Sequence, residues 1–264
     1  MIKQFTSLFL LGLFGCSMIQ DHALRRPDHI YPLKKELKEI SGLSYIDQSK
    51  MVAIQDEKGI IYSLGIGSFE KSSKISFSKK GDYEGIATTS KRFFVLKSNG
   101  TIVSVNHLGE DKVIHRFPGK AAVEFEGICH DEINNRLLLV SKDHPSKKKN
   151  KYINIYSFDL NSNLYLLKPI IKLAKKEIGI YRNAGLLPSG IAINPADGYI
   201  YILASVGKKL ICLDYNGKLI HYYNLDKTIY KQPEGISFSK NGELYIASEG
   251  KSGKAQIMHF TSIP

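Results

Sequence analysis

A five-residue phrase recurs along this chain and limits what the chain can fold into. Each copy ends in a glycine followed by an aliphatic residue, and the residue before the glycine is a carboxylate or a hydroxyl. The copies occupy residues 39–43, 82–86, 124–128, 187–191 and 232–236, so their glycines are 43, 42, 63 and 45 residues apart. Four-stranded propeller blades repeat every 40 to 50 residues or so. The spacing therefore predicts an all-β fold, a β-propeller with five blades rather than six.

The N-terminus predicts export and a lipid anchor. Lys3 precedes an apolar run from Phe5 to Phe14 that is too short to span a bilayer permanently. The run leads into Leu13-Phe14-Gly15-Cys16, which resembles a bacterial lipobox, although Phe14 is bulkier than is usual at its position. Residues 1–16 are thus expected to be a lipoprotein signal peptide, with Cys16 diacylated and carrying palmitate-type chains. The alternative is an ordinary signal peptide with an incidental cysteine.

The rest of the chain is expected to be one exported domain. Residues 17–28 are polar and are interpreted as a tether, and residues 29–264 as a single propeller. Ser17 after the cysteine favours the outer over the inner membrane, so we expect the domain in the periplasm or at the cell surface. Cys129 and Cys212 fall in different repeats and are expected to be buried thiols.

Charge and repeat length refine this interpretation. The formal net charge of +12 is spread along the chain and favours contact with anionic lipid. No nucleic-acid-binding motif accompanies it, so no nucleic-acid partner is expected. The domain is expected to be a monomer. Only 29 residues follow Gly235, which is about one strand too few, so the segment from His29 to Leu37 is expected to complete the last blade. A helical turn is expected near 171–176, and the linker 173–187 is expected to approach the channel.

The phrase also predicts a site. In a propeller the first strand of each blade lines the central channel, so Glu84, Glu126 and Glu234 should converge at one mouth with Ser41 and Ser189. Clustered carboxylates raise one another's pKa and need a nearby positive charge. A ring of oxygen ligands without nitrogen or sulfur suits Ca²⁺ rather than zinc. A second tier lies two residues upstream, at Glu39, Asp82, Glu124 and Gln232.

The same phrase is also compatible with a site that holds no metal. Lysines at the ends of second strands, Lys97 and Lys142, face the same mouth by repeat position and would neutralise the acids by themselves. Asp56 and Glu249 occupy equivalent positions, and Arg182 in the linker is another candidate for holding an anion. A glycine before an inner strand also serves packing, because no Cβ fits where blades crowd the axis. Packing explains the glycines but not the acids before them.

With the later run from Gly242 to Glu249, the five phrases resemble the SdiA-regulated (YjiK-type) propeller family of bacterial envelope proteins. The resemblance covers residues 29 to 260 or so. It implies a calcium-associated propeller, often exported or membrane-anchored, with an acidic ring at Glu84, Glu126 and Glu234. A more distant likeness to phytase-like and esterase-like propellers implies hydrolysis as an alternative activity. The long third repeat departs from both patterns.

The sequence is therefore compatible with three functions. The first is a calcium-binding module on the envelope that presents or binds a small-molecule or envelope ligand. The second is a calcium-dependent hydrolase of phosphoesters or lactones, with Glu126 or Glu84 as base and Lys97, Lys142 or Arg182 holding an anion. The third is a metal-free scaffold that is neutralised by lysines.

Overall fold

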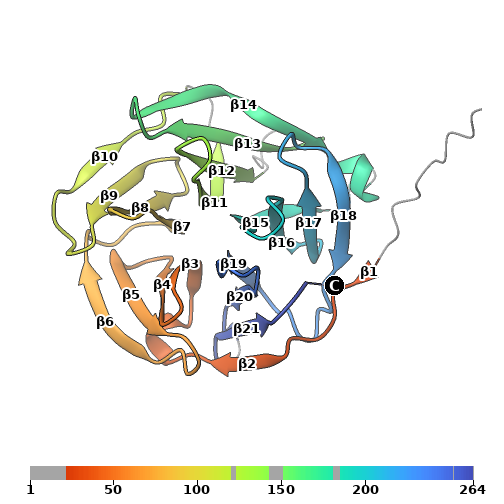
Figure 1. Ribbon diagram of the computed structural model, residues 1–264, viewed down its shortest axis with the longest axis horizontal. Coiled ribbons are helices and arrows are strands. Elements are labelled where there is room, and N and C mark those ends of the chain that lie inside the picture. Colours follow the sequence, from red (N-terminus) through yellow and green to blue (C-terminus); the bar gives the residue numbers. More distant parts are fainter. Residues whose placement is uncertain (1–21, 120–122, 143–150, 181–184, 252, 264) are drawn as a thin grey trace, which may run out of the picture.

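The chain forms a ring of five antiparallel sheets around a central axis (Figure 1). The computed structural model describes residues 22–119, 123–142, 151–180, 185–251 and 253–263. Helix within these ranges is confined to two 3-10 turns, η1 (Lys35–Leu37) and η2 (Lys175–Ile178), and neither is long and apolar enough to cross a membrane. The predicted five-bladed propeller is confirmed.

Each blade uses four strands in order from the axis outward. Blade 1 contains β3 (Ile40–Asp47), β4 (Lys50–Gln55), β5 (Ile60–Gly65) and β6 (Lys71–Ser76). Blade 2 contains β7 (Tyr83–Thr88), β8 (Arg92–Lys97), β9 (Ile102–Asn106) and β10 (Val113–His115). Blade 3 contains β11 (Glu124–Asp131), β12 (Arg136–Lys142), β13 (Tyr152–Asp159) and β14 (Leu164–Ala174). Blade 4 contains β15 (Leu187–Ile193), β16 (Ile200–Val206), β17 (Lys209–Leu213) and β18 (Leu219–Asn224).

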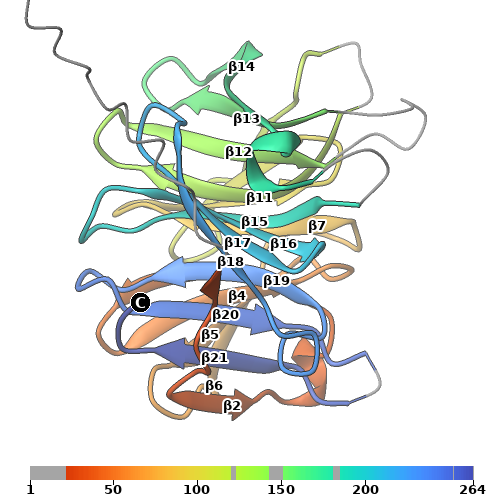
Figure 2. The ribbon, with the colours of Figure 1, turned by 90° about the vertical axis from the view of Figure 1, so that its right-hand side faces the viewer.

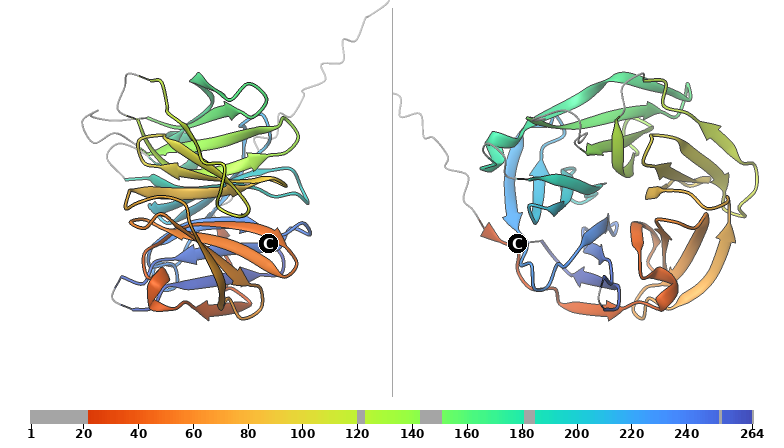
Figure 3. Two further views of the ribbon diagram at one scale, coloured as in Figure 1. Left: turned by 90° about the vertical axis from the view of Figure 1, so that its left-hand side faces the viewer. Right: turned by 180° about the vertical axis from the view of Figure 1, so that it is seen from behind.

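Blade 5 joins the two ends of the chain. Its inner strands are β19 (Pro233–Phe238), β20 (Leu244–Ser248) and β21 (Gln256–Phe260), and its outer strand is β2 (His29–Pro32). β2 pairs antiparallel with β21, and His29 lies opposite His259. Figure 3 shows this early segment, in red-orange, lying along the blue C-terminal blade. The predicted closure by the N-terminal segment is confirmed, and it leaves no blade lacking a fourth strand.

The segment before β2 packs on the ring from residue 22 onward. β1 (His22–Ala23) runs parallel to β18 and adds a fifth strand to blade 4. Leu24 is buried, and Arg25 pairs with Asp28 at 2.6 Å. The C-terminal half of the segment that the sequence predicts to be a tether, 17–28, is therefore part of the folded ring. Cys16 lies outside the described residues.

The hydrophobic core is divided into five clusters, one between each pair of neighbouring blades. Each sheet is therefore buried on both faces, which explains the weak alternation of apolar and polar residues in the strands. Ile171 and Leu173 lie in the cluster between blades 3 and 4. Burial of these side chains favours a long β14 where the sequence suggested a helical turn, and η2 begins only at Lys175. Cys129 and Cys212 are free and buried, as predicted.

The strands run across the thickness of the ring, so the connecting loops gather at its two ends (Figure 2). Each inner strand contacts the inner strands of both neighbouring blades, and the repeated glycines lie where they approach. A Cβ built on Gly127 would lie 2.8 Å from the Cα of Gly190, and one built on Gly42 would lie 2.9 Å from the Cα of Gly85. These distances are too short for any side chain, so the glycines allow the ring to close.

We expect Gly127→Ala to destabilise the domain by about 1–3 kcal/mol, because the new methyl group meets backbone that cannot rotate away. The matched control is Gly65→Ala at the end of β5, where a Cβ meets nothing within 4 Å. Urea unfolding of both variants measures the difference. Equal unfolding midpoints for Gly127→Ala and the parent protein would show that the glycine ring is not under steric constraint.

Candidate functional site

The residue before each repeated glycine sits in a β-bulge. The pairing between first and second strands skips one residue in every blade: Ser41, Glu84, Glu126, Ser189 and Glu234. A bulge leaves one residue out of the ladder and re-aims its side chain. Four of the five, Ser189 excepted, line one cavity at the end of the channel.

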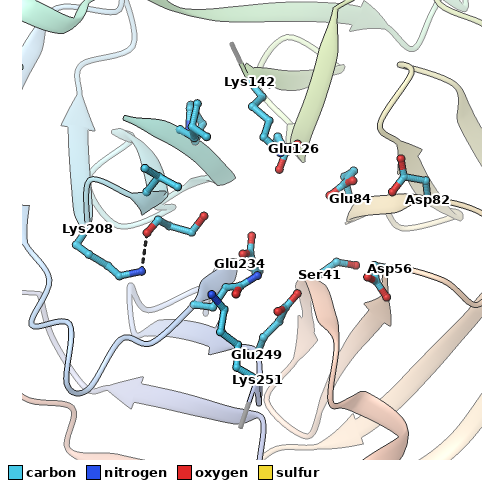
Figure 4. Close-up of a pocket in the computed structure, with 15 residues that line it drawn as sticks. Ser41, Asp56, Asp82, Glu84, Glu126, Lys142, Lys208, Glu234, Glu249 and Lys251 are labelled. Carbon is cyan, nitrogen blue, oxygen red and sulfur yellow. Dashed lines mark hydrogen bonds and ion pairs between the residues drawn. The ribbon is translucent and has the colours of Figure 1, made fainter. Parts of the chain in front are cut away.

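This cavity, which we call the mouth, has a volume of about 380 Å³. Figure 4 shows Glu84, Glu126 and Glu234 placed around it on three different blades. Most of its lining is polar. The lining residues are Ser41, Asp56, Asp82, Glu84, Glu126, Lys142, Leu187, Pro188, Ser205, Val206, Lys208, Gln232, Glu234, Glu249 and Lys251. Six carboxyl groups and three lysines therefore share this one small cavity.

The lysines neutralise the acids only in part. Lys142 Nζ lies 2.8 Å from Glu126 Oε1, and this is the sole ion pair between lining residues in the described part of the chain. Lys208 instead donates to the main-chain carbonyls of Ser205, at 2.6 Å, and Lys231, at 3.0 Å. The ammonium group of Lys208, at the left of Figure 4, is thus bound by main-chain carbonyls rather than by a carboxylate.

Burial and mutual repulsion raise the pKa values of the acids at the mouth. Burial raises the pKa of Glu234 to about 8, with further contributions from Glu249 and Glu126. Burial, together with Asp56, raises the pKa of Glu249 to about 7. The pKa of Glu84 is also raised, by burial first and then by Glu126 and Asp82. At neutral pH the mouth therefore carries fewer negative charges than its carboxyl groups would suggest.

Two oxygen atoms at the mouth are buried without a hydrogen-bond partner. They are Ser41 Oγ and Asp56 Oδ1, on neighbouring segments of blade 1. Buried polar atoms are normally satisfied, and an unsatisfied one costs about 1–3 kcal/mol. Their position in an acidic cavity indicates a place where a cation or a donor group would be stabilised.

The carboxylates do not form a compact metal cluster. Throughout the described residues, no three or more His, Cys, Asp or Glu side chains are placed to hold one metal ion together. Calcium, however, takes water, hydroxyl and carbonyl oxygen as well as carboxylate among its six to eight ligands. The oxygen-rich donor set at the mouth fits such an ion chemically, with fewer than three acids as direct ligands.

The structure gathers most, but not all, of the residues singled out from the sequence. Glu84, Glu126, Glu234, Asp82, Ser41, Asp56, Glu249 and Lys142 line the mouth. Glu39, Glu124, Lys97 and Ser189 do not. Ser189 is buried and donates to Pro233 O at 2.7 Å, so it links blade 4 to blade 5. Lys97 lies over the Tyr83 ring at 5.6 Å. Arg182 lies outside the described residues.

Two lysines at the mouth were not singled out from the sequence. Lys208 follows β16 and Lys251 follows β20, each within three residues of the strand end. Lys97 and Lys142 end the second strands of blades 2 and 3. A lysine at or just after the second strand is thus a second repeated feature, and aligning the repeats beyond the strand ends would have revealed it.

The comparisons with known proteins agree with this architecture. A family model described as SdiA-regulated matches residues 27–251. No curated protein matches the chain. The structure of Myxococcus xanthus glutaminyl cyclase is similar with a TM-score of 0.61 and 12% identity, covering 93% of this chain and 100% of that one.

Other solved structures show the same fold. A Bacteroides thetaiotaomicron protein of unknown function has a TM-score of 0.56 at 14% identity, covering 84% of this chain and 56% of its own. A luciferin-regenerating enzyme has a TM-score of 0.53 at 11% identity, covering 89% and 96%. Identities this low establish the fold alone.

The raised pKa values predict that the metal-free domain loses stability as pH rises. Glu234 and Glu249 bind protons more tightly when folded than when unfolded, where a glutamate has a pKa of about 4.3. Their contribution is therefore complete below about pH 4.3 and disappears as pH rises through 7 to 8 or so. Melting temperatures in EDTA from pH 6 to pH 9 measure this loss. Glu234→Gln should flatten the decline, the exposed control Glu110→Gln should not, and parallel curves for all three proteins would contradict the prediction.

Proposed function

Because the chain belongs to the SdiA-regulated family, we propose that it is a lipid-anchored envelope protein whose propeller binds calcium at its acidic mouth. The anchor is the diacylated Cys16, outside the described residues, and the outer membrane is the favoured location. The bound ion either stabilises the ring or presents a coordination position to a small-molecule or envelope ligand. Detergent phase partitioning of the full chain and of Cys16→Ser tests the anchor, since only the lipidated protein should enter the detergent phase.

The observation that carries the proposal is the shortage of positive charge at the mouth. Lys142 forms an ion pair with Glu126, whereas Glu84, Glu234 and Glu249 have no ion pair within the described residues. Burial and the neighbouring acids raise the pKa of each of these three groups, and Ser41 Oγ and Asp56 Oδ1 have no hydrogen-bond partner. A hard divalent cation bound by one or two of these carboxylates would lower the repulsion among the acids and favour their ionised forms. The mouth is large enough for a hydrated ion and a ligand group.

Calcium should therefore stabilise the mature domain. At a concentration about a hundredfold above Kd the expected gain is about 2.7 kcal/mol, which corresponds to a rise in Tm of about 5–10 °C. The gain should grow from pH 6 to pH 8.5, because binding requires deprotonated Glu84 and Glu234, and it should be accompanied by proton release. Glu234→Gln should remove most of the gain, and Glu110→Gln should keep it. Identical melting in EDTA and in calcium would reject the metal and leave the lysine-neutralised scaffold.

A second candidate function is a calcium-dependent hydrolase of phosphoesters or lactones. The favouring observation is that a half-buried ammonium, Lys142, adjoins the buried Glu126, and that Lys208 and Lys251 line the same cavity. These groups are suited to holding an anionic substrate beside a general base. Phosphomonoester and lactone substrates are assayed with calcium present. Glu126→Gln should lower turnover by about a hundredfold or more, whereas equal background rates for both proteins would exclude hydrolysis.

A further inference from the structure

A second cavity lies at the opposite end of the ring from the mouth. It is a groove of about 810 Å³ between blades 2 and 3, and it lies outside every part of the site described above. Its walls come from the turn after β7, from β8 to β10, and from the turns after β11 and β13. His130 and Glu132 lie near the far end of β11, whereas Glu126 lies near its start at the mouth. We call this cavity the blade 2–3 groove.

Positive charge in the blade 2–3 groove lacks an acidic partner. Arg92 donates to two main-chain carbonyls, that of Ser104 at 3.4 Å and that of Asp111, and forms no ion pair among the described residues. Lys91 and His115 line the same groove. The guanidinium of Arg92 is close enough to His115 to help burial lower the pKa of that imidazole. An anion placed here would meet the positive charges of Arg92 and Lys91 and the imidazole of His115.

A histidine in the groove has an unsatisfied nitrogen. His130 Nε2 is buried and has no hydrogen-bond partner, although the residue lines the cavity. Burial lowers the pKa of His130, while Glu132 and Asp131 act in the opposite direction. Asp131 is already engaged by Arg136 at 2.6 Å and by Tyr215. Asp131 is thus occupied elsewhere, and the buried Nε2 of His130 keeps an unused hydrogen-bonding capacity beside the groove.

The groove also has an apolar wall. Phe94, Val113 and Leu160 line it, and Val113 is 45% exposed. Polar hydroxyl and amide groups, from Thr89, Ser90, Asn135 and Asn163, line the rest. A cavity of this volume with an apolar wall and a few convergent polar groups has the character of a small-molecule site. An inorganic ion alone would leave the apolar wall unused.

We propose that the blade 2–3 groove binds a small organic anion, whose carboxylate or similar head lies near Arg92 and His130 and whose apolar body packs on Phe94 and Leu160. The site is separate from the mouth and does not depend on calcium. The head is recognised by guanidinium and imidazole donors, and the body by contact area.

Benzoate, titrated calorimetrically at low salt, is the first probe, and benzylammonium, with the same ring and the opposite charge, is its counterpart. Benzoate should bind saturably and benzylammonium should not. Arg92→Gln should weaken benzoate binding about tenfold or more, because a charge-assisted hydrogen bond is lost. The matched control Lys240→Gln removes one charge from an exposed turn of blade 5 and should change the affinity by less than about twofold.

The pH profile supplies an independent readout. Benzoate affinity should increase between about pH 8 and about pH 5.5, because an anion favours the charged imidazole. His130→Gln should bind benzoate at pH 8 and show less of this increase. Circular dichroism establishes that the variants are folded. If Arg92→Gln does not fold, Lys91→Gln takes its place, with a loss of about threefold expected. Equal binding of benzoate and benzylammonium, no saturable binding, or an unchanged affinity in the folded variants would overturn the proposal.

Discussion

The rest of the structure depends on one constraint, the close approach of the inner-strand backbones at the repeated glycines around the axis. Five inner strands meet at glycines, and a Cβ on Gly190 would lie 2.9 Å from the carbonyl oxygen of Glu234. The space enclosed by this ring amounts to only about 10 Å³, hardly enough for one water molecule. The bulged residue comes directly before each glycine, so the same local geometry closes the ring and turns Glu84, Glu126 and Glu234 toward the mouth. The same repeated phrase of the sequence therefore determines both the close packing of the glycines and the position of the acids at the mouth.

The repeated phrase could predict the blades because glycine spacing records a packing requirement that every blade shares. The outer strands were harder to predict, because their side chains face solvent and carry no apolar pattern. β6, for example, is Lys71–Ser76 and is mostly exposed. β14 was missed for a different reason: Ile171 and Leu173 suggested a helical turn, whereas alternate burial against blade 4 makes them part of a strand. The parallel pairing of β1 could not be predicted, because a strand of two residues is too short to show a pattern in the sequence.

Which side chains line the mouth could be predicted only as far as the two-residue period of a regular strand holds. A regular strand repeats every two residues, which would place Glu124 on the same face as Glu126. The bulge at Glu126 breaks this period, and Glu124, paired with Lys142 in the ladder, does not line the cavity. Asp82 precedes β7 and is not held by that ladder, so it does reach the mouth. Lys208 and Lys251 lie on loops, where neither period nor propensity fixes the direction of a side chain.

The ring of glycines also separates the two ends of the propeller axis. The space among the glycines is about 10 Å³, roughly what one water molecule needs, so we expect little exchange of solutes between the mouth and the opposite end. The mouth, with its raised carboxyl pKa values, is therefore expected to exchange protons and cations with solvent at its own end of the ring. The blade 2–3 groove opens beside β11, the strand that also carries Glu126, at the other end. Any coupling between a cation at the mouth and an anion in the groove would have to pass along the sheets of blades 2 and 3, which are buried on both faces. We therefore expect occupancy of one site to leave the affinity of the other nearly unchanged.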